Sequence, residues 1–262
     1  YVSANATAAQ WEAAITPQTK MIYLETPTNP GLEVLDIAMI SAIAKKHHVI
    51  LNVDNCFATP IGQTPIDLGA DLVVHSATKW IDGQGRVLGG AVVGRKDLIH
   101  EIYLFCRNTG PSLSPFNAWI LSKSLETLEV RMERHSKSAF SIAQKLEGHA
   151  KINFVKYPFL KSHPQHAIAI KQMKDGGGIV CFELKGGLEA GQQFLNHLKM
   201  LSLTANLGDS RSIASHPAST THSKLSEAER QALAITPGLI RISVGLEHEE
   251  DILNDILQAL EA

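Results

Sequence analysis

The sequence predicts an α/β fold in which a mostly parallel sheet precedes a smaller α+β unit. Strand-type and helix-type segments alternate over residues 20–80, which is the pattern of a parallel sheet whose faces are covered. Residues 116–147 contain neither glycine nor proline, and they predict one long helix or a kinked pair. Further strands and helices then follow in the order typical of an α+β domain.

The first unit rests on three predicted strands, over residues 20–25, 49–55 and 71–79. The first strand stops at the turn-rich T-P-T-N-P-G, residues 26–31. Asp36 is expected to cap a helix that ends near Lys45 and Lys46, where cations suit the helix dipole. A short helix is expected over residues 65–70.

The second unit is predicted from apolar segments that follow the long helical region. Strands are expected at residues 152–155, 179–184 and 239–244, and helices at residues 188–201 and 249–262. Apolar residues from Phe116 to Leu146 form an interrupted stripe along the helical region. This region is therefore expected to join the two units.

Bulk composition excludes several classes of protein. The chain has 262 residues, of which 44% are hydrophobic and 19% charged, and its net charge is −2. This balance gives no basis for a nucleic-acid or membrane-surface partner. No apolar run approaches the ~20 residues needed to cross a bilayer, and the first residues show no signal-peptide pattern. A cytoplasmic location is therefore expected.

Cysteine and histidine usage predicts neither a disulfide framework nor a metal site. Cys56, Cys106 and Cys181 are odd in number and far apart. The 12 histidines include H-P-Q-H, residues 163–166, but no set of Cys, His and Asp residues has the closed spacing of a zinc site. We expect no bound metal.

Polar residues stand where the predicted parallel strands end. Asn29 follows the first strand, Asp54 closes the second, and the third finishes with Ser76, Thr78 and Lys79. Ligands of such sheets bind outside the carboxyl ends of the strands. An amine, a nearby carboxylate and hydroxyls are what pyridoxal phosphate requires, for a Schiff base, a protonated pyridine nitrogen and the phosphate. By spacing alone, a solvated lysine and a capping aspartate remain the alternatives.

Six motifs carry a resemblance to a known family. They are E-T-P-T-N-P (25–30), V-D-N-C-F-A-T-P (53–60), H-S-A-T-K-W (75–80), V-L-G-G (87–90), S-H-P-A-S-T-T-H (215–222) and I-R-I-S-V-G-L-E (240–247). In this order they resemble the signature motifs of the cysteine and methionine metabolism family of pyridoxal-phosphate enzymes. That family contains cystathionine synthases and lyases, methionine lyase and homoserine sulfhydrylases.

The resemblance implies the aspartate-aminotransferase-like fold, known as fold type I. Residues 1–135 would form part of its cofactor-binding large domain, and residues 136–262 its small C-terminal α+β domain. Lys79 would be the Schiff-base lysine and Asp54 the partner of the pyridine nitrogen. Ser76 and Thr78 would bind the cofactor phosphate.

The same resemblance implies how the substrate is held. Asn29 would contact the phenolic oxygen of the cofactor or the substrate carboxylate. Arg241 would hold the substrate α-carboxylate bidentately, with Ser212 alongside, because a guanidinium matches a carboxylate in shape and charge. Without the resemblance, Arg241 would be interpreted as an exposed residue of a surface strand.

Three segments look most like O-succinylhomoserine sulfhydrylases, namely residues 83–90, 108–119 and 207–212. The implied reaction is a γ-replacement of methionine biosynthesis, in which O-succinylhomoserine and sulfide give homocysteine and succinate. Arg211 or Arg86 is hypothesised to bind the succinyl carboxylate, and a surface salt bridge is the alternative for each. Cystathionine γ-synthase and the cystathionine or methionine lyases are the alternatives within the family.

The resemblance maps onto the C-terminal two-thirds of a typical family member. Nothing in the sequence matches the upstream glycine-rich phosphate loop, the tyrosine that stacks on the cofactor ring, or the arm that completes a neighbouring subunit's site. One hypothesis is that the chain is the greater part of an active transferase. The other is a catalytically incomplete fragment that folds or oligomerises without turnover. Because family members are typically dimers of dimers, a homotetramer is expected.

Overall fold

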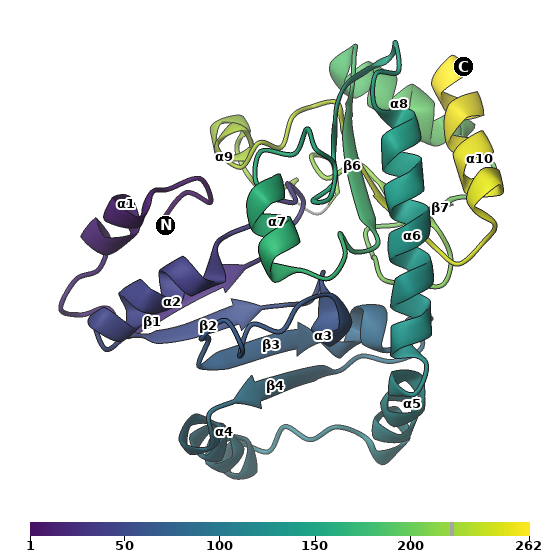
Figure 1. Ribbon diagram of the computed structural model, residues 1–262. Coiled ribbons are helices and arrows are strands. Elements are labelled where there is room, and N and C mark those ends of the chain that lie inside the picture. The colour runs from purple at the N-terminus through teal and green to yellow at the C-terminus, as the bar shows by residue number, and fades with distance from the viewer. Residues whose placement is uncertain (221–222) are drawn as a thin grey trace.

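The computed structural model describes residues 1–220 and 223–262, and in these residues two sheets are joined by a long helix (Figure 1). Thr221 and His222, which end the S-H-P-A-S-T-T-H motif, lie outside the described residues. Within the described part of the chain, no helix has both the length and the apolar character to cross a bilayer.

The first sheet has the strand order β1-β2-β3-β4 and occupies the lower half of Figure 1. Its strands are β1 (Met21–Glu25), β2 (Ile50–Asp54), β3 (Leu72–Ser76) and β4 (Gly90–Gly94). The first three strands are parallel, and β4 runs antiparallel to β3. The register pairs Glu25 with Asp54 and Asp54 with Val74, so the carboxyl ends of the three parallel strands meet at one edge of the sheet.

The helical segments of this half are α1 (Ala8–Ala13), α2 (Ile37–Lys46), α3 (Thr59–Gly62), η1 (Ala77–Ile81) and α4 (Lys96–Thr109). Asp36 caps α2 as predicted, because its side chain accepts the backbone N–H of Met39 at 2.9 Å. One face of the sheet buries Leu51 and Val53 against Ile37 of α2. This packing holds the sheet in place, and with it the polar residues at the carboxyl ends of its parallel strands.

Two predictions about this half are wrong. Residues 65–70 form turns and no helix, because Gly69 adopts φ +99°, a left-handed conformation that ends helical progression. Lys79 does not end the third strand, since β3 stops at Ser76 and Lys79 lies in η1 with non-helical φ −91° and ψ −124°. The strand stops where its pairing with β4 stops, at Ser76 opposite Gly90.

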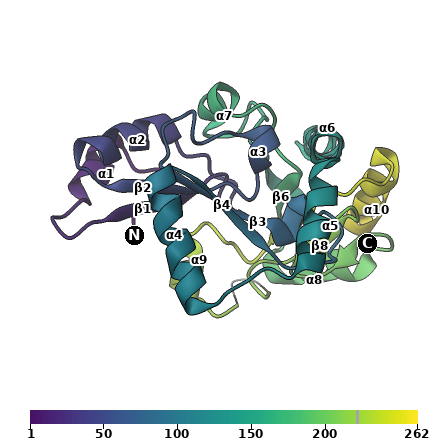
Figure 2. The same ribbon diagram turned by 90° about the horizontal axis from the view of Figure 1, so that it is seen from below.

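Of the two predicted alternatives, one long helix or a kinked pair, the structure has the pair, α5 (Pro115–Leu125) and α6 (Leu128–Leu146). The beginning of α6 packs Met132 in a core with Trp80, whereas Ile142 and Leu146 near its end pack on the second sheet. The division predicted between residues 135 and 136 falls inside this helix and stays a prediction. Viewed from below, α4 and α5 lie in front of the strands (Figure 2).

The second sheet has the order β5-β6-β9-β8-β7. Its strands are β5 (Ile152–Lys156), β6 (Ile179–Leu184), β7 (Ser202–Leu203), β8 (Ile213–Ser215) and β9 (Leu239–Ser243). Its helices are α7 (His166–Gln172), α8 (Gly187–His197), α9 (Glu227–Ala232) and α10 (Glu249–Glu261). The predicted β5, β6, β9, α8 and α10 are thus confirmed within a few residues at their ends.

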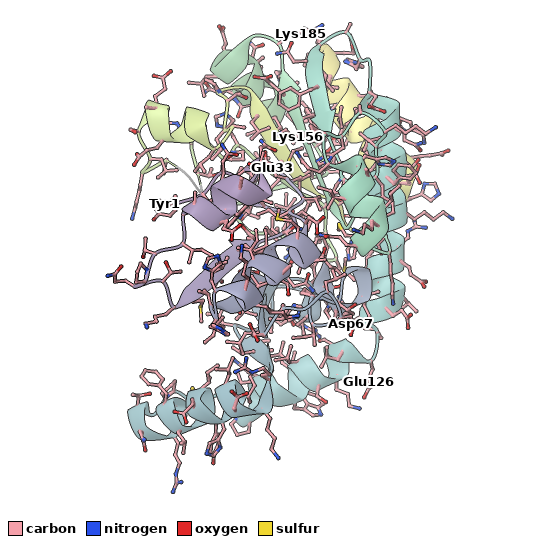
Figure 3. All side chains as sticks on the ribbon, turned by 60° about the vertical axis from the view of Figure 1, so that its left-hand side comes forward. Tyr1, Glu33, Asp67, Glu126, Lys156 and Lys185 are labelled. Carbon is pink, nitrogen blue, oxygen red and sulfur yellow. The ribbon has the colours of Figure 1, made fainter. Side chains whose placement is uncertain are left out.

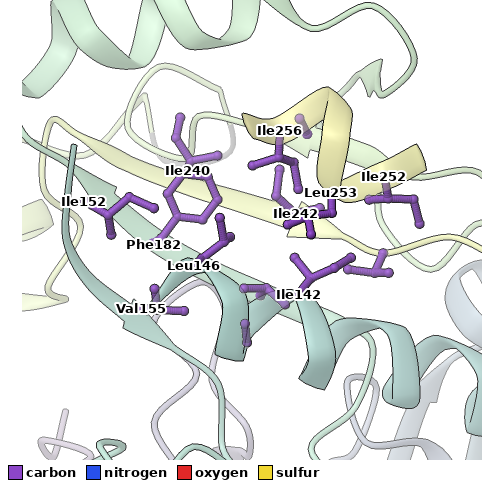
Figure 4. Packing of buried hydrophobic residues seen from close by; sticks show 14 of the residues in the cluster. Ile142, Leu146, Ile152, Val155, Phe182, Ile240, Ile242, Ile252, Leu253 and Ile256 are labelled. Carbon is purple, nitrogen blue, oxygen red and sulfur yellow. The ribbon is translucent and has the colours of Figure 1, made fainter. Parts of the chain in front are cut away.

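The core of the second sheet lies between its strands and two helices. Figure 4 shows Phe182, Ile240 and Ile242 from the sheet beside Ile142 of α6 and Ile256 of α10, and all five are fully buried. Full burial of each such side chain contributes about 1.5–3 kcal/mol. This core holds β9 rigidly, and β9 carries Arg241.

Contacts from the second sheet hold the loop that follows β1. Lys156 of β5 forms an ion pair with Glu33, with 3.0 Å between Nζ and Oε1, and Glu33 also accepts a hydrogen bond from Thr28 (Figure 3). The Cys181 thiol donates to the Pro30 carbonyl at 3.0 Å. Residues 28–33 are therefore positioned by both halves of the molecule.

Candidate active site

Lys79 is a half-buried amine at the centre of the candidate site. Its Nζ donates a hydrogen bond to the side-chain oxygen of Asn206. Gly208, at φ +76°, lets this loop approach η1, since a Cβ there would lie 3.0 Å from the Lys79 Cα. Burial lowers the pKa of Lys79; neighbouring Cys56 opposes this shift and the Arg241 guanidinium adds to it. The lowered pKa favours the uncharged amine, which is the form that acts as nucleophile and base.

Asp54 is the last residue of β2, and both oxygens of its carboxylate accept hydrogen bonds. Oδ1 accepts the backbone N–H of Cys56 at 3.0 Å, and Oδ2 accepts the Tyr23 hydroxyl at 3.3 Å. Burial, together with the charge of Asp54, raises the pKa of Tyr23 to about 12. Tyr23 therefore stays a hydrogen-bond donor at neutral pH, and it orients the carboxylate.

The two predicted phosphate ligands, Ser76 and Thr78, differ in whether their hydroxyls already form hydrogen bonds. The Thr78 hydroxyl accepts the backbone N–H of Gly89 at 3.1 Å and donates to the Gly89 carbonyl at 3.3 Å. The half-buried Ser76 side chain makes no hydrogen bond to any other described residue. Ser76 is thus free to donate to an anion, whereas Thr78 would first release a long bond to Gly89.

Arg241 is a buried cation without an acidic partner. Side chains alternate along β9, so Ile240 and Ile242 enter the core while Arg241 faces the first sheet. Its Nη1 donates to the Asn29 side-chain oxygen at 2.8 Å, and its Nη2 donates at 3.2 Å to the carbonyls of Ala205 and Asn206.

The guanidinium is only partly satisfied by these contacts. Arg241 is 1% exposed, its Nε has no partner, and no described carboxylate forms an ion pair with it. Burial lowers the pKa of Arg241, and a buried unpaired charge costs several kcal/mol. The alternative interpretation of Arg241 as an exposed residue of a surface strand is wrong, because the side chain is buried. An anionic ligand would offset the cost of the buried charge, and the predicted carboxylate-binding role stays a prediction.

Ser212 and the two arginines hypothesised to bind the succinyl carboxylate already form contacts with other residues. The buried Ser212 hydroxyl donates to Glu247 at 2.9 Å and accepts the Gly245 N–H at 2.8 Å. Arg211 pairs with Asp209 at 2.9 Å, and Arg86 pairs with Asp82 at 3.0 Å. These contacts match the salt-bridge alternative for both arginines, and the roles predicted for all three residues stay predictions.

The structure brings together Lys79, Asn29 and Arg241, which are far apart in the sequence. Asn206 links them, because its side chain accepts from Lys79 and its carbonyl accepts from Arg241. Asn206 was not predicted as a site residue, because it lies in no recognised motif. Glu25 was also missed, although it begins the E-T-P-T-N-P motif and pairs in register with Asp54.

Other features of the described residues do not compete with this site. Cavities of about 420 and 430 Å³ lie elsewhere, one lined by α8 and α10 and the other by α6, and neither contains a predicted site residue. Residues 1–220 and 223–262 contain no group of three His, Cys, Asp or Glu side chains arranged for a metal ion.

The donor set suits pyridoxal phosphate on structural grounds. Lys79 offers an amine with a lowered pKa, Asp54 an oriented carboxylate and Ser76 an unused hydroxyl. The Nε of Arg241 has no hydrogen-bond partner, while its Nη1 donates to Asn29, so the guanidinium keeps a donor for a carboxylate. The residues present therefore fit the cofactor and an amino-acid substrate.

Comparison with known proteins gives a family match over nearly the whole chain. Residues 2–261 match the family described as Cys/Met metabolism PLP-dependent enzyme. The chain is 48% identical over 254 residues to an O-succinylhomoserine sulfhydrylase of Pseudomonas aeruginosa, which covers 97% of this chain and 63% of the relative. It is 47% identical over 251 residues to an L-methionine gamma-lyase of Fusobacterium nucleatum subsp. polymorphum, covering 95% of this chain and 64% of the relative.

A solved structure is similar over the same span. The crystal structure of cystathionine gamma synthase from Xanthomonas oryzae pv. oryzae in complex with cystathionine matches with a TM-score of 0.94 and 39% identity. The match covers 97% of this chain and 66% of that chain. This chain thus spans just under two thirds of the length of these relatives.

Proposed function

The chain belongs to the Cys/Met metabolism family of PLP-dependent enzymes, and on that premise we propose that it is the greater part of an O-succinylhomoserine sulfhydrylase. The predicted family, the fold type I class and pyridoxal phosphate as the family's cofactor are confirmed. The proposed reaction is a γ-replacement in which sulfide takes the place of succinate to give homocysteine.

One observation carries the proposal, namely a buried, unpaired guanidinium linked through one asparagine to a half-buried lysine. Arg241 supplies the charge for an α-carboxylate, and Lys79 supplies a base within the same site. An amino acid bound by its carboxylate at Arg241 would present its Cα toward the lysine side. This arrangement supports proton transfer at the carbons next to that carboxylate.

The proposed mechanism assigns a task to each predicted residue. When bound, pyridoxal phosphate supplies a protonated ring that accepts the electron pair of the broken Cα–H bond. Asp54 would keep the ring nitrogen protonated, and Ser76 and Thr78 would hold the phosphate. Lys79 would hold the cofactor until the substrate amine displaces it.

Proton transfers would then pass through the freed Lys79 amine. Lys79 would take the proton from Cα, pass it on to the bound cofactor and so regain its free amine, and then take a proton from Cβ, so that succinate can depart from Cγ with its bonding pair. After sulfide adds at Cγ, Lys79 would return the protons. Asn29 and Arg241 would keep the carboxylate fixed throughout, with Ser212 alongside, and burial, which lowers the pKa of Lys79, favours the uncharged amine that acts as the base.

Three alternatives have specific support. Methionine gamma-lyase relatives are as similar as the sulfhydrylase, at 47% against 48% identity, and a cystathionine gamma synthase is among the solved structures that this chain resembles. A catalytically incomplete fragment is the alternative of another class, because the chain spans 63% of the sulfhydrylase relative. The open edge of the first sheet at β4 favours the same alternative.

A spectroscopic experiment tests cofactor binding first. The purified chain is mixed with pyridoxal phosphate, and a new visible absorption band is expected from the cofactor bound to Lys79. Lys79→Ala should lose the band, whereas Lys161→Ala, which replaces an exposed lysine, should keep it. No band in the unaltered chain would support the incomplete fragment.

Product analysis then separates the activities. Homocysteine formed from O-succinylhomoserine and sulfide supports the sulfhydrylase, cystathionine formed with cysteine supports the synthase, and a 2-oxo acid released from methionine supports the lyase. Neutral replacements of Arg211 and Arg86 should raise KM for the succinylated substrate if either binds its succinyl carboxylate. An unchanged KM removes that residue from the specificity proposal.

We also propose a cytoplasmic homotetramer, a dimer of dimers, acting on small molecules and not on nucleic acid or membranes. The near-neutral net charge of −2 supports the absence of nucleic-acid binding. Light scattering of the purified chain measures the assembly, and a monomer at all concentrations would contradict it.

A further inference from the structure

Glu25 lies in the site without a task in the proposed chemistry. It is the last residue of β1, and the register places it opposite Asp54 on β2. It is partly buried, and its Oε2 accepts the backbone N–H of Asn29 at 3.1 Å. A second carboxyl beside Asp54 at the end of adjacent strands is electrostatically unfavourable unless something else stabilises it.

Asn29 connects Glu25 to the substrate-binding arginine. Its backbone is held by Glu25, and its side-chain oxygen accepts from Arg241 Nη1 at 2.8 Å. Asn29 therefore lies between the Glu25 carboxylate and the Arg241 guanidinium, and these two charges attract each other. Glu25 is the acidic group in position to compensate Arg241 while making no direct ion pair with it.

Several charged and titratable groups surround this carboxyl. Asp54 and Cys56 approach it from β2 and the turn after it, Tyr23 from its own strand, and Arg241 from β9. Burial raises the pKa of Glu25 to about 7; the Asn29 N–H opposes the rise, Asp54 adds to it and Arg241 opposes it. Tyr23 and Cys56 each have a pKa raised to about 12, so neither titrates near neutral pH.

We propose that Glu25 is a positioning residue that anchors Asn29 against Arg241 and takes up a proton from solvent when a carboxylate ligand binds Arg241. This inference rests on the proposed function, because it takes Arg241 as the carboxylate site. A ligand anion beside Arg241 adds a negative charge near Glu25 and so favours its protonated form. Carboxylate affinity then falls as pH rises through the titration of Glu25, since deprotonated Glu25 must first regain a proton.

Nuclear magnetic resonance of the cofactor-free chain tests the anchor directly. The backbone N–H of Asn29 donates a hydrogen bond to Glu25. The chemical shift of this amide proton should therefore change with pH, with a midpoint near the Glu25 pKa of about 7. Glu25→Gln should abolish that titration. Glu33→Gln is the matched control, because Glu33 is a partly buried carboxylate of the same loop region that contacts Thr28 and Lys156 instead.

A carboxylate probe without an amine tests the proton coupling. Saturating propionate should raise the Asn29 midpoint by about one pH unit, a tenfold gain in proton affinity. The propionate Kd should accordingly rise about tenfold from low to high pH in the unaltered chain. In Glu25→Gln this pH dependence should disappear, and in Glu33→Gln it should persist.

Three outcomes would overturn the inference. They are an Asn29 amide that does not titrate near neutral pH, a titration that survives in Glu25→Gln, and a midpoint that propionate leaves unchanged. None of these measurements requires the cofactor. A chain that gains the Lys79-dependent absorption band but shows no Asn29 titration would refute the role of Glu25 and leave the proposed function intact.

Discussion

The two sheets of this chain differ in how completely they are covered. In the second sheet, every residue of β9 is buried, and helices α6 and α10 pack Ile142 and Ile256 over its core. In the first sheet, every residue of β4 is exposed, and none of the 14 described residues of α4 is buried. One half is thus a closed core, and the other is covered on only part of its surface.

The uncovered part of the first half is apolar. Large exposed hydrophobic residues lie on or near β4, α4 and α5, namely Leu88, Val92, Val93, Tyr103, Phe105, Leu113, Phe116, Trp119 and Leu125. An edge strand with apolar neighbours is a place where further polypeptide can pair. From this difference we predict that stability, and any ligand binding by Arg241, depend on the closed half, and that association of the chain would use the open one.

The largest expected effect is a cavity in the closed core. Ile240→Ala should lower the free energy of unfolding by about 2–5 kcal/mol, because the removed atoms leave a void among fully buried neighbours. Val93→Ala on exposed β4 should change it by no more than about 0.5 kcal/mol. Urea denaturation measures both, and equal losses would contradict the contrast between the sheets.

Loss of the ion pair between Lys156 and Glu33, which joins the two halves, should have the next largest effect on the free energy of unfolding. Lys156→Met leaves Glu33 partly buried without its cation, so the free energy of unfolding should fall by about 1.5–3 kcal/mol, the range for hydrogen bonds to charged groups. Lys161→Met, which changes an exposed lysine, serves as the control. A variant as stable as the control would show that the ion pair does not join the halves.

A buried carboxylate makes the closed half sensitive to acid. Asp255 accepts the backbone N–H groups of Lys199, Met200 and Leu201. Burial opposes ionisation of Asp255, but these hydrogen bonds outweigh it and lower the pKa. Its stabilisation is therefore present above the unfolded pKa of about 3.9 and is lost as pH falls through the lower folded value.

Asp255→Asn measures this stabilisation. The variant should be less stable than the unaltered chain by about 1–2 kcal/mol at neutral pH, and the difference should shrink as the solution is acidified below the unfolded pKa. Asp251→Asn on the exposed side of the same helix is the control. A difference that stays constant with pH would exclude the carboxylate as its source.

The smallest effect on stability is expected on the open half. Trp119 is 60% exposed on α5, so Trp119→Lys should alter the free energy of unfolding by no more than about 0.5 kcal/mol. The same change should weaken concentration-dependent association, because it places a charge among exposed apolar residues. Sedimentation at several concentrations checks this, and undiminished association would move the contact surface elsewhere.

Local sequence patterns predicted much of the fold. The Asp36 cap and the boundaries of β6 follow from neighbouring residues, so periodicity and capping chemistry reveal them. β4 escaped prediction because G-A-V-V-G carries no alternating pattern and forms by pairing with β3. The short helix expected over residues 65–70 failed because Gly69 adopts a left-handed turn that packs against Ser41.

The sequence by itself determined which chemical groups this protein carries, since its motifs place the Lys79 amine shortly after a strand, the Asp54 carboxylate at the end of one and the Arg241 guanidinium within one. Only the tertiary structure decided how they meet. Asn29 and Arg241 are 212 residues apart yet hydrogen-bonded, and Asn206 joins Lys79 to the same guanidinium. Local patterns arise from near neighbours, whereas such distant contacts arise only when the two sheets pack together and bring residues of both into contact.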